Sequence, residues 1–436
     1  MNPPRSLSRP YVAAMLLGFL LSPLLLPSPG GAATLSPWEF TTSLQVPRFS
    51  PGMAATNTHV YVLGGGTGTN CTILGSVEFA PIQANGSLGP WATTTALSFP
   101  RGYLGAAIVG KYVYVVGGAN WCGLIEATKY ATVERAEILA DGSLGPWSAV
   151  APLTHGRAMM PVVTDGTHLY AVGGFDGTNT NTVEMATVQP DGSLSSWQSV
   201  SAMTQGRAGA AVAVLNGRLY AAGGLGAGIQ ASSESAAILP DGTLGAWQPM
   251  AAMSVRRYQA AGAGVGGSFW VTGGTPNGVV LNSTEEAVLD QTGTITNWLP
   301  GAPMQTPRDA HAAVVSGPVI YVAGGVSNAG GLPAVEASVE FASVPVPDAD
   351  QDGIPDAAEP CFCLNTPPGA AVNQFGCAVN QVCPCQAPLG RTAWRNHGEY
   401  VTCIGNAARE FVDQGLITDR DASRMIQEAA QALCGR

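Results

Sequence analysis

A repeat of about 50 residues occurs six times between residues 35 and 344, and it limits the possible folds more than any other feature. Every copy contains an apolar run that ends in Gly-Gly, with an Arg sixteen residues before the first Gly. A Trp stands ten residues before each Arg, and a Glu precedes the next Trp by thirteen residues or takes the equivalent place in the last copy. The Arg are Arg48, Arg101, Arg157, Arg207, Arg257 and Arg308, and the Glu are Glu78, Glu134, Glu184, Glu234, Glu285 and Glu340.

This spacing resembles the kelch repeat, in which each copy forms one four-stranded blade of a β-propeller. The resemblance implies an all-β, six-bladed kelch β-propeller over residues 34–344. The last copy stops near Val344 without a turn and Trp of its own, whereas the chain begins with an unpaired segment around Trp38. We therefore expect the N-terminal strand to complete the sixth blade, which leaves no open sheet edge.

Composition excludes several classes of protein. Only 11% of the residues are charged, the formal net charge is −10, and Gly (56) and Pro (32) are abundant. Gly and Pro disfavour long helices, and an acidic chain without basic runs is a poor nucleic-acid binder. We expect a monomer with no membrane span in the mature chain and no nucleic-acid partner.

Residues 1–33 have the pattern of a secretory signal peptide. Arg5 and Arg9 precede a short apolar run, and Gly31-Ala32-Ala33 offers the small residues of a cleavage site. An uncleaved membrane anchor is the alternative, which Pro23 and the shortness of the apolar run disfavour. The mature protein is expected to be secreted, periplasmic or attached to the cell surface, where disulfides persist.

The repeated charges allow two interpretations. Arg and Glu could line the central channel and hold an acidic or sugar ligand. Alternatively, each Arg could form an ion pair with the Glu of its own blade and fix the register of the blades. We favour the second interpretation, because a specific site should break the sixfold symmetry. The repeated Trp are likewise expected to pack between blades.

A binding site is therefore expected where the copies differ. The turns lie at one end of each blade, so the loops after Gly-Gly and those between Trp and Arg lie at the other end, where loop length also varies. Aromatic and amide side chains there suit a glycan, a peptide or a surface protein, although solvated loop tips are the alternative. The candidate residues are Tyr103, Met159, Tyr258, Gln259, Asp309 and His311 at the channel mouth, with Trp121, Phe175 and Asn179 in the loops.

Catalysis is the less favoured hypothesis. Kelch-like propellers include copper radical oxidases, which need His and Tyr ligands, but the five His of this chain have no metal-ligand spacing. They also include sugar mutarotases that use Glu and Arg as acid and base. Glu126, Glu137, Asp309 and His311 lie outside the repeat register and could serve in that way, although no nucleophile–base pair is evident.

Residues 345–360 predict a calcium-binding linker. The run Asp348 to Glu359 fits an Asp-x-Asp-x-Asp-Gly loop, with Gly353 at the sharp turn. An acidic solvated linker is the alternative. The segment resembles a thrombospondin type 3 repeat, which also occurs in linkers of proteins related to outer-membrane protein A. The expected calcium ligands are Asp348, Asp350, Asp352, the carbonyl of Ile354, Asp356 and Glu359.

The nine Cys predict disulfides, with one thiol left over. Cys71 and Cys122 lie in loops of adjacent blades on one face, so a bridge between them is plausible. The same thrombospondin-type resemblance implies a Cys363–Cys377 bridge, but Cys361 departs from the pattern and leaves this pairing open to exchange. Because nine is odd, one thiol stays free or joins another chain, and we expect it to be Cys361. In residues 361–436 we expect a disulfide-rich helical hairpin, with helices over 396–413 and from about 418 to 433. Two bridges among Cys383, Cys385, Cys403 and Cys434 would hold it, and a metal site is the alternative.

Overall fold

The computed structural model describes residues 35–68, 71–121, 128–328, 333–344, 397–413 and 417–431. The predicted signal peptide (1–33), the predicted calcium linker (345–360) and every Cys except Cys71 and Cys403 lie outside these residues. Those predictions stay predictions.

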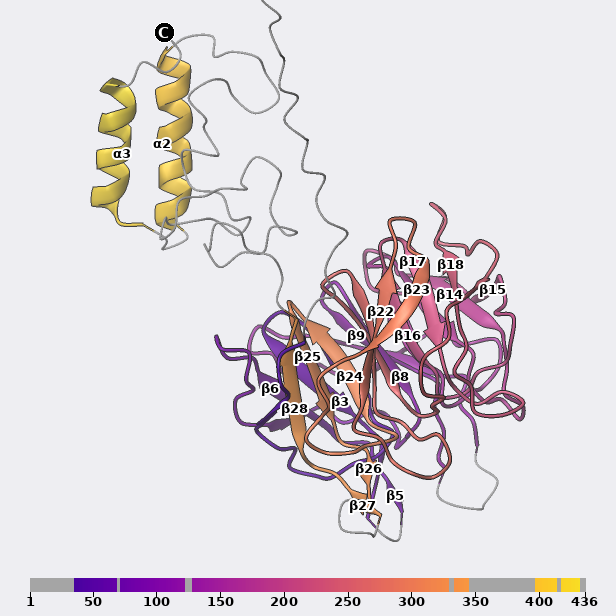
Figure 1. Cartoon of the computed structure of the whole chain (residues 1–436). Coiled ribbons are helices and arrows are strands. Elements are labelled where there is room, and N and C mark those ends of the chain that lie inside the picture. Colours follow the sequence, from indigo (N-terminus) through magenta and orange to yellow (C-terminus); the bar gives the residue numbers. More distant parts are fainter. Residues whose placement is uncertain are drawn as a thin grey trace, which may run out of the picture. The chain divides into compact units, whose positions relative to one another are not determined.

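The repeats form six four-stranded antiparallel sheets, so the predicted six-bladed propeller is confirmed (Figure 1). In blades 1 to 5 the strands follow one another in sequence order, from the innermost to the outermost. Blade 1 contains β2 (Gly52–Ala55), β3 (His59–Leu63), β6 (Val77–Pro81) and β7 (Ala92–Thr94), and blade 2 contains β8 (Gly105–Val109), β9 (Tyr112–Val116), β10 (Val133–Glu137) and β11 (Ser148–Val150). Blade 3 contains β12 (Val162–Thr164), β13 (His168–Val172), β14 (Val183–Thr187) and β15 (Gln198–Val200), and blade 4 contains β16 (Ala211–Leu215), β17 (Arg218–Ala222), β18 (Ser233–Ala237) and β19 (Gln248–Met250). Blade 5 contains β20 (Ala261–Val265), β21 (Ser268–Thr272), β22 (Thr284–Leu289) and β23 (Ile295–Pro300).

The sixth blade combines the two ends of the repeat region. Its inner strands are β24 (Ala312–Ser316), β25 (Val319–Ala323) and β28 (Val339–Ser343), and its outer strand is β1 (Glu39–Thr41), which pairs with β28. The N–H of Ser36 also donates to the carbonyl of Ser343 at 2.8 Å. The predicted closure of the ring by the N-terminal strand is confirmed.

The cores of the propeller lie between adjacent blades. Strands β3 and β25, for example, contribute Val60, Val62, Tyr321 and Ala323 to one buried cluster between blades 1 and 6. The second strand of every blade is apolar on both sides because it packs against a neighbouring blade on each face. Each repeated Trp also donates its indole N–H to a carbonyl of the preceding blade, as Trp91 does to Thr42 at 2.7 Å. The Trp therefore bind blades together.

A second interblade contact comes from Tyr side chains on the second strands. Tyr220 donates its hydroxyl proton to the carbonyl of Gly293 at 2.8 Å, in the turn between the third and fourth strands of the next blade. Tyr61, Tyr114, Tyr170 and Tyr321 make the equivalent bond. Blade 5 has Trp270 at this position, and among the described residues its buried indole N–H has no acceptor. The next blade is the sixth, which has no such turn because the two ends of the repeat region meet there.

The two ends of the propeller differ. One end, which we call the turn face, has the tight turns between the third and fourth strands. The other, which we call the Gly-Gly face, has the loops that follow each Gly-Gly. Two small ribbons extend on the Gly-Gly face, β4 (Gly66–Thr67) with β5 (Thr72–Ile73) and β26 (Val326–Ser327) with β27 (Ala334–Val335). Figure 1 shows β5, β26 and β27 at the same end.

The C-terminal region contains two described helices, α2 (His397–Asp413) and α3 (Asp419–Gln431). Their facing sides form a cluster that includes Tyr400, Ile404, Ala408 and Phe411, at the helical spacing read from the sequence. Thr418 caps α3, since its hydroxyl donates to Asp421 at 2.6 Å and accepts from the Asp421 N–H at 3.2 Å. Among the described residues, no helix has the length and apolar character needed to cross a membrane.

Candidate functional site

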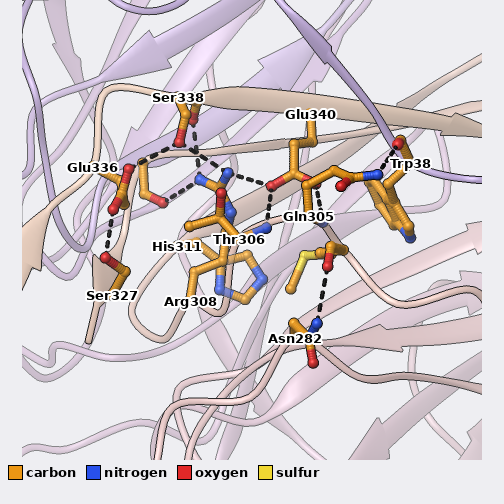
Figure 2. A network of polar contacts seen from close by, with 12 residues as sticks. Trp38, Asn282, Gln305, Thr306, Arg308, His311, Ser327, Glu336, Ser338 and Glu340 are labelled. Atoms are coloured by element: carbon orange, nitrogen blue, oxygen red, sulfur yellow. Dashed lines mark hydrogen bonds and ion pairs between the residues drawn. The ribbon is translucent and has the colours of Figure 1, made fainter. Parts of the chain in front are cut away.

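The six repeated Arg form buried ion pairs with the Glu of their own blades. In blade 6, shown in Figure 2, Arg308 Nη2 lies 2.6 Å from Glu340 Oε1, and both side chains are fully buried. Nη1 of Arg308 donates to the carbonyl of Gly324, the first Gly of Gly-Gly, at 2.8 Å. Every blade repeats this arrangement, in the pairs Arg48–Glu78, Arg101–Glu134, Arg157–Glu184, Arg207–Glu234, Arg257–Glu285 and Arg308–Glu340.

The same Glu fix the chain where it crosses from one blade to the next. Glu340 accepts the backbone N–H of Gln305 at 2.6 Å and that of Thr306 at 3.0 Å, just before the Arg (Figure 2). Each carboxylate thereby joins the crossover segment, the Arg and the third strand. These twelve residues are structural, because none of them is open to a ligand in the channel.

The residue two positions after each Arg belongs to a closed ring of backbone hydrogen bonds. Each of these six residues has a left-handed backbone, with φ between 48° and 58°. The N–H of each donates to the carbonyl of its counterpart in the preceding blade, at 2.6 to 3.1 Å. We call this set the mouth ring, and it contains Ser50, Tyr103, Met159, Gly209, Gln259 and Ala310. The backbone geometry is the same in every blade, so only the side chains differ.

The mouth ring surrounds one end of the central cavity. The cavity has a volume of about 470 Å³ and is lined by the six innermost strands. Ala, Gly, Val and Met make up most of its wall, which contains no Asp, Glu, Lys or Arg. The polar side chains are those of Ser50, Tyr103, Thr164, Gln259 and His311. The channel is therefore uncharged, and any ionic recognition must occur at its mouth.

Aromatic rings surround part of the mouth on the Gly-Gly face. Phe49, Tyr103, Trp121 and Phe175 follow one another with ring centroids 6.2, 5.6 and 5.8 Å apart, and we call them the aromatic arc. The arc extends from blade 1 to blade 3. Such rings present flat apolar faces of the kind that bind sugars, cations and peptide side chains.

Tyr258 covers another part of the mouth. It comes from blade 5, and a Cβ atom built on Gly209 would lie 3.2 Å from its ring, so the ring packs over blade 4. The Tyr258 hydroxyl lies 3.9 Å from the sulfur of Met159 in blade 3. Burial, the Tyr103 phenol and the Asp309 charge together raise the pKa of Tyr258 to about 12. The phenol therefore stays protonated at neutral pH.

Asp309 stands beside the mouth ring at the base of the β26–β27 ribbon. Its N–H donates to the carbonyl of Val326 at 3.0 Å, and its carbonyl accepts the Val326 N–H at 2.8 Å. Phe49 occupies the equivalent place in blade 1, paired with Gly66. Burial raises the pKa of the Asp309 carboxyl to about 6. For Tyr103, burial and the Asp309 charge raise the pKa, whereas a hydrogen bond with Ser50 lowers it.

The other predicted site residues are more dispersed. His311 is buried between blades 5 and 6, where its Nε2 lies 2.9 Å from the Thr272 hydroxyl, and burial lowers its pKa to about 3. It is neutral and also forms part of the channel wall. Asn179 donates to the carbonyl of Gly226 at 3.0 Å, so it joins two loops of the Gly-Gly face. Phe49 belongs to the arc but was not among the predicted site residues.

The described residues contain no group of three or more His, Cys, Asp and Glu that could hold a metal ion. Cys71 and Cys403 are disulfide-bonded, and the sulfur partner of each lies outside the described residues. The predicted pairings, including Cys71–Cys122, therefore stay predictions. Cys71 lies near the arc, with its sulfur 3.9 Å from the carbonyl of Trp121.

The fold and the buried Arg–Glu pairs define a six-bladed β-propeller built from kelch-type blades. The Kelch motif matches residues 156–185, which run from the Arg to the Glu of blade 3. Among solved structures, 693 chains match, including one described as "Structure of YjhT". That structure has 16% sequence identity and a TM-score of 0.54, and the match covers 68% of this chain and 95% of the other. None of the curated proteins matches the chain.

Proposed function

We propose that this chain is a recognition protein that binds its partner at the mouth of the propeller on the Gly-Gly face. The observation that carries the proposal is the aromatic arc beside the mouth ring. The mouth ring itself has the same backbone conformation in every blade but a different residue at each of its six positions. A rigid scaffold with variable loops is a common basis for binding. Glycans, peptides and protein surfaces are the partners that such aromatic side chains suit.

Binding of the purified chain to a glycan array and to a peptide array tests this proposal. We expect the arrays to identify a partner. The affinity for this partner should fall at least about tenfold in the Tyr258→Ala variant, since buried aromatic contacts dominate most interfaces. Phe40→Ala is the matched control, because Phe40 is 57% exposed on β1, away from the mouth. Binding that depends on Phe40 and not on Tyr258 would place the site elsewhere and contradict the proposal.

A sugar mutarotase is the second candidate, favoured by one observation. The Asp309 carboxyl has a pKa near 6, where a single group can serve as acid and base at neutral pH. NMR exchange spectroscopy on a panel of reducing sugars would detect faster anomer interconversion. Acceleration that is lost in Asp309→Asn would favour this candidate, and unchanged exchange rates for the whole panel would exclude it for those sugars.

We further propose that the chain is exported and that its linker binds calcium. The support is the signal-like pattern of residues 1–33 and the acidic loop from Asp348 to Glu359. Calorimetric titration with calcium should give a dissociation constant between micromolar and millimolar, as in extracellular loops. Asp350→Ala should abolish the binding. No heat of binding in the wild type would overturn the calcium proposal.

A further inference from the structure

Asp309 is the exception among the carboxylates of the propeller. Nine of the described propeller carboxylates are buried or partly buried. Eight of them accept hydrogen bonds or ion pairs, namely the six repeated Glu, together with Glu286 and Glu336. Among the described residues, the side chain of Asp309 has no donor and no cation. A partly buried charge without a partner is costly, and such groups often mark functional sites.

Among the residues that the structure describes, none near Asp309 carries a positive charge that could serve as its partner. Arg308 precedes it in the chain, but the Arg308 guanidinium points inward to Glu340 and two carbonyls (Figure 2). His311 is neutral and is bonded to Thr272. Burial raises the pKa of two phenols at the mouth, Tyr103 and Tyr258, and the charge of Asp309 adds to the rise in both. This part of the mouth is therefore electrostatically negative.

The rings near Asp309 suit a cation as well. The mouth ring brings blades 5, 6, 1 and 2 together in that order, because Ala310 bonds to Gln259 and Ser50, and Ser50 bonds to Tyr103. Tyr258 and Tyr103 thus come from the two sides of Asp309, and Phe49 packs edge-on against Tyr103. A carboxylate and aromatic side chains at the same mouth are the groups that recognise organic cations. The described cation over the arc, Lys129, lies 5.2 Å from the Phe175 ring at the far end.

We propose that the mouth binds an organic cation, a guanidinium or an ammonium group, against the carboxylate of Asp309 with Tyr103 and Tyr258 beside it. The inference rests on the proposed function, and it names the chemical class of the ligand. Any ligand that covers the mouth removes the remaining water from Asp309. A neutral ligand leaves that charge uncompensated, whereas a guanidinium or ammonium group neutralises it and donates hydrogen bonds to it. One carboxylate with two phenols offers too few oxygen ligands for a divalent metal.

Calorimetric titration of the whole chain with matched probes tests the inference. The peptide acetyl-Gly-Arg-Gly-amide carries the guanidinium, and the same peptide with citrulline is its neutral isostere. Choline tests a free organic cation, so the two cationic probes distinguish a protein side chain from a small ligand. We expect at least one cationic probe to bind about tenfold or more tightly than the citrulline peptide, because it alone forms the ion pair.

Two variants identify the residue responsible. Asp309→Asn keeps the shape and should remove the preference for the cation. Asp176→Asn removes an exposed charge on the same face, keeps the turn that Asp176 forms with Thr178, and should leave the preference unchanged. Equal binding of the arginine and citrulline peptides without choline binding, or a preference that survives in Asp309→Asn, would overturn the inference. A glycan or acidic peptide that needs Tyr258 but not Asp309 would overturn it while the proposed function stood.

Discussion

Glu340 and Asp309 both belong to the sixth blade, but within the described part of the chain only the Glu340 carboxylate has partners. Glu340 accepts from Arg308 and from two backbone N–H groups. In the five other blades the equivalent Glu accepts from its Arg and from one or two backbone N–H groups. Asp309 occurs once, at a position where the other blades carry Phe49, Gly102, Ala158, Ala208 and Tyr258. The repeated carboxylates hold the scaffold, and we propose that Asp309, which has no partner among the described residues, serves a ligand. Sixfold repetition then marks the charges that hold the scaffold.

The largest expected effect comes from breaking one repeated pair. Glu340→Ala leaves the Arg308 guanidinium buried without its counter-charge and two backbone N–H groups without an acceptor. Removing one partner of a buried ion pair typically costs about 3–5 kcal/mol of unfolding free energy. Urea denaturation followed by Trp fluorescence measures this loss. A loss below about 1 kcal/mol would mean that the pairs contribute no more than surface pairs do.

Removing the Asp309 carboxylate should raise the unfolding free energy, whereas removing that of Glu340 lowers it. Asp309→Asn should stabilise the propeller at pH 8 by about 1–2 kcal/mol, after allowance for partial solvent screening. The native carboxyl, with a pKa near 6, binds its proton more tightly than the unfolded one, at 3.8. The unfolding free energy of the wild type therefore falls as pH rises from about 4 to about 6, and the variant should lose this contribution. Denaturation curves at pH 4.5 and pH 8 check it, and destabilisation at pH 8 would reveal a partner for Asp309.

The interblade Tyr contacts predict a smaller effect. Tyr220→Phe removes one buried hydrogen bond, to the carbonyl of Gly293, and should cost about 1 kcal/mol. Trp270→Phe removes no such bond, because the sixth blade has no turn to accept it. Comparing the two variants by urea denaturation shows how much of the change in unfolding free energy comes from the hydrogen bond and how much from the packing of the ring. Tyr220→Phe without any cost would show that the contact does not hold the blades together.

The pH dependence of probe binding tests the role of Asp309 without a change in sequence. Only the ionised carboxylate attracts a cation, so the affinity of a cationic probe should rise between pH 5 and pH 7.5 by roughly tenfold, in proportion to the ionised fraction. Tyr258 does not contribute, because its phenol has a pKa of about 12. The Asp309→Asn variant should bind the cationic probe with the same low affinity at pH 5 and at pH 7.5. A wild-type affinity that does not change with pH would show that binding does not depend on the Asp309 carboxylate.

Most of the scaffold could be predicted from the sequence, because each structural role recurs at a fixed spacing. The Gly-Gly strands, the Arg, the Glu and the closure near Trp38 all follow from comparing six copies. Repetition also favoured the ion pairs over a charged channel, and the buried side chains have that arrangement. The mouth positions could be located by the same logic, as the places where the copies stop agreeing.

What the sequence could not give was the chemistry of those divergent positions. Asp309 and His311 were equal candidates as mouth residues. The interblade packing buries His311 beside Thr272, whereas Asp309 has no partner among the residues that the structure describes. The left-handed backbone of the mouth ring had no sequence signal, because Tyr103, Met159 and Gln259 do not favour that conformation. Among the described residues, the Trp270 indole N–H has no acceptor because the two ends of the repeat region meet in the sixth blade, and this also could not be read from the sequence.

The ionisation of the Asp309 side chain gives the sharpest test of the proposed cation site. NMR titration of the side-chain carboxyl carbon, assigned with Asp309→Asn, gives its pKa in the free protein and in the presence of the arginine peptide. The account predicts a value near 6 in the free protein. It also predicts that the bound cation lowers this value by at least about one unit, because a nearby positive charge favours the ionised form. A free value near 4, or a value that the saturating arginine peptide leaves unchanged, would contradict the account.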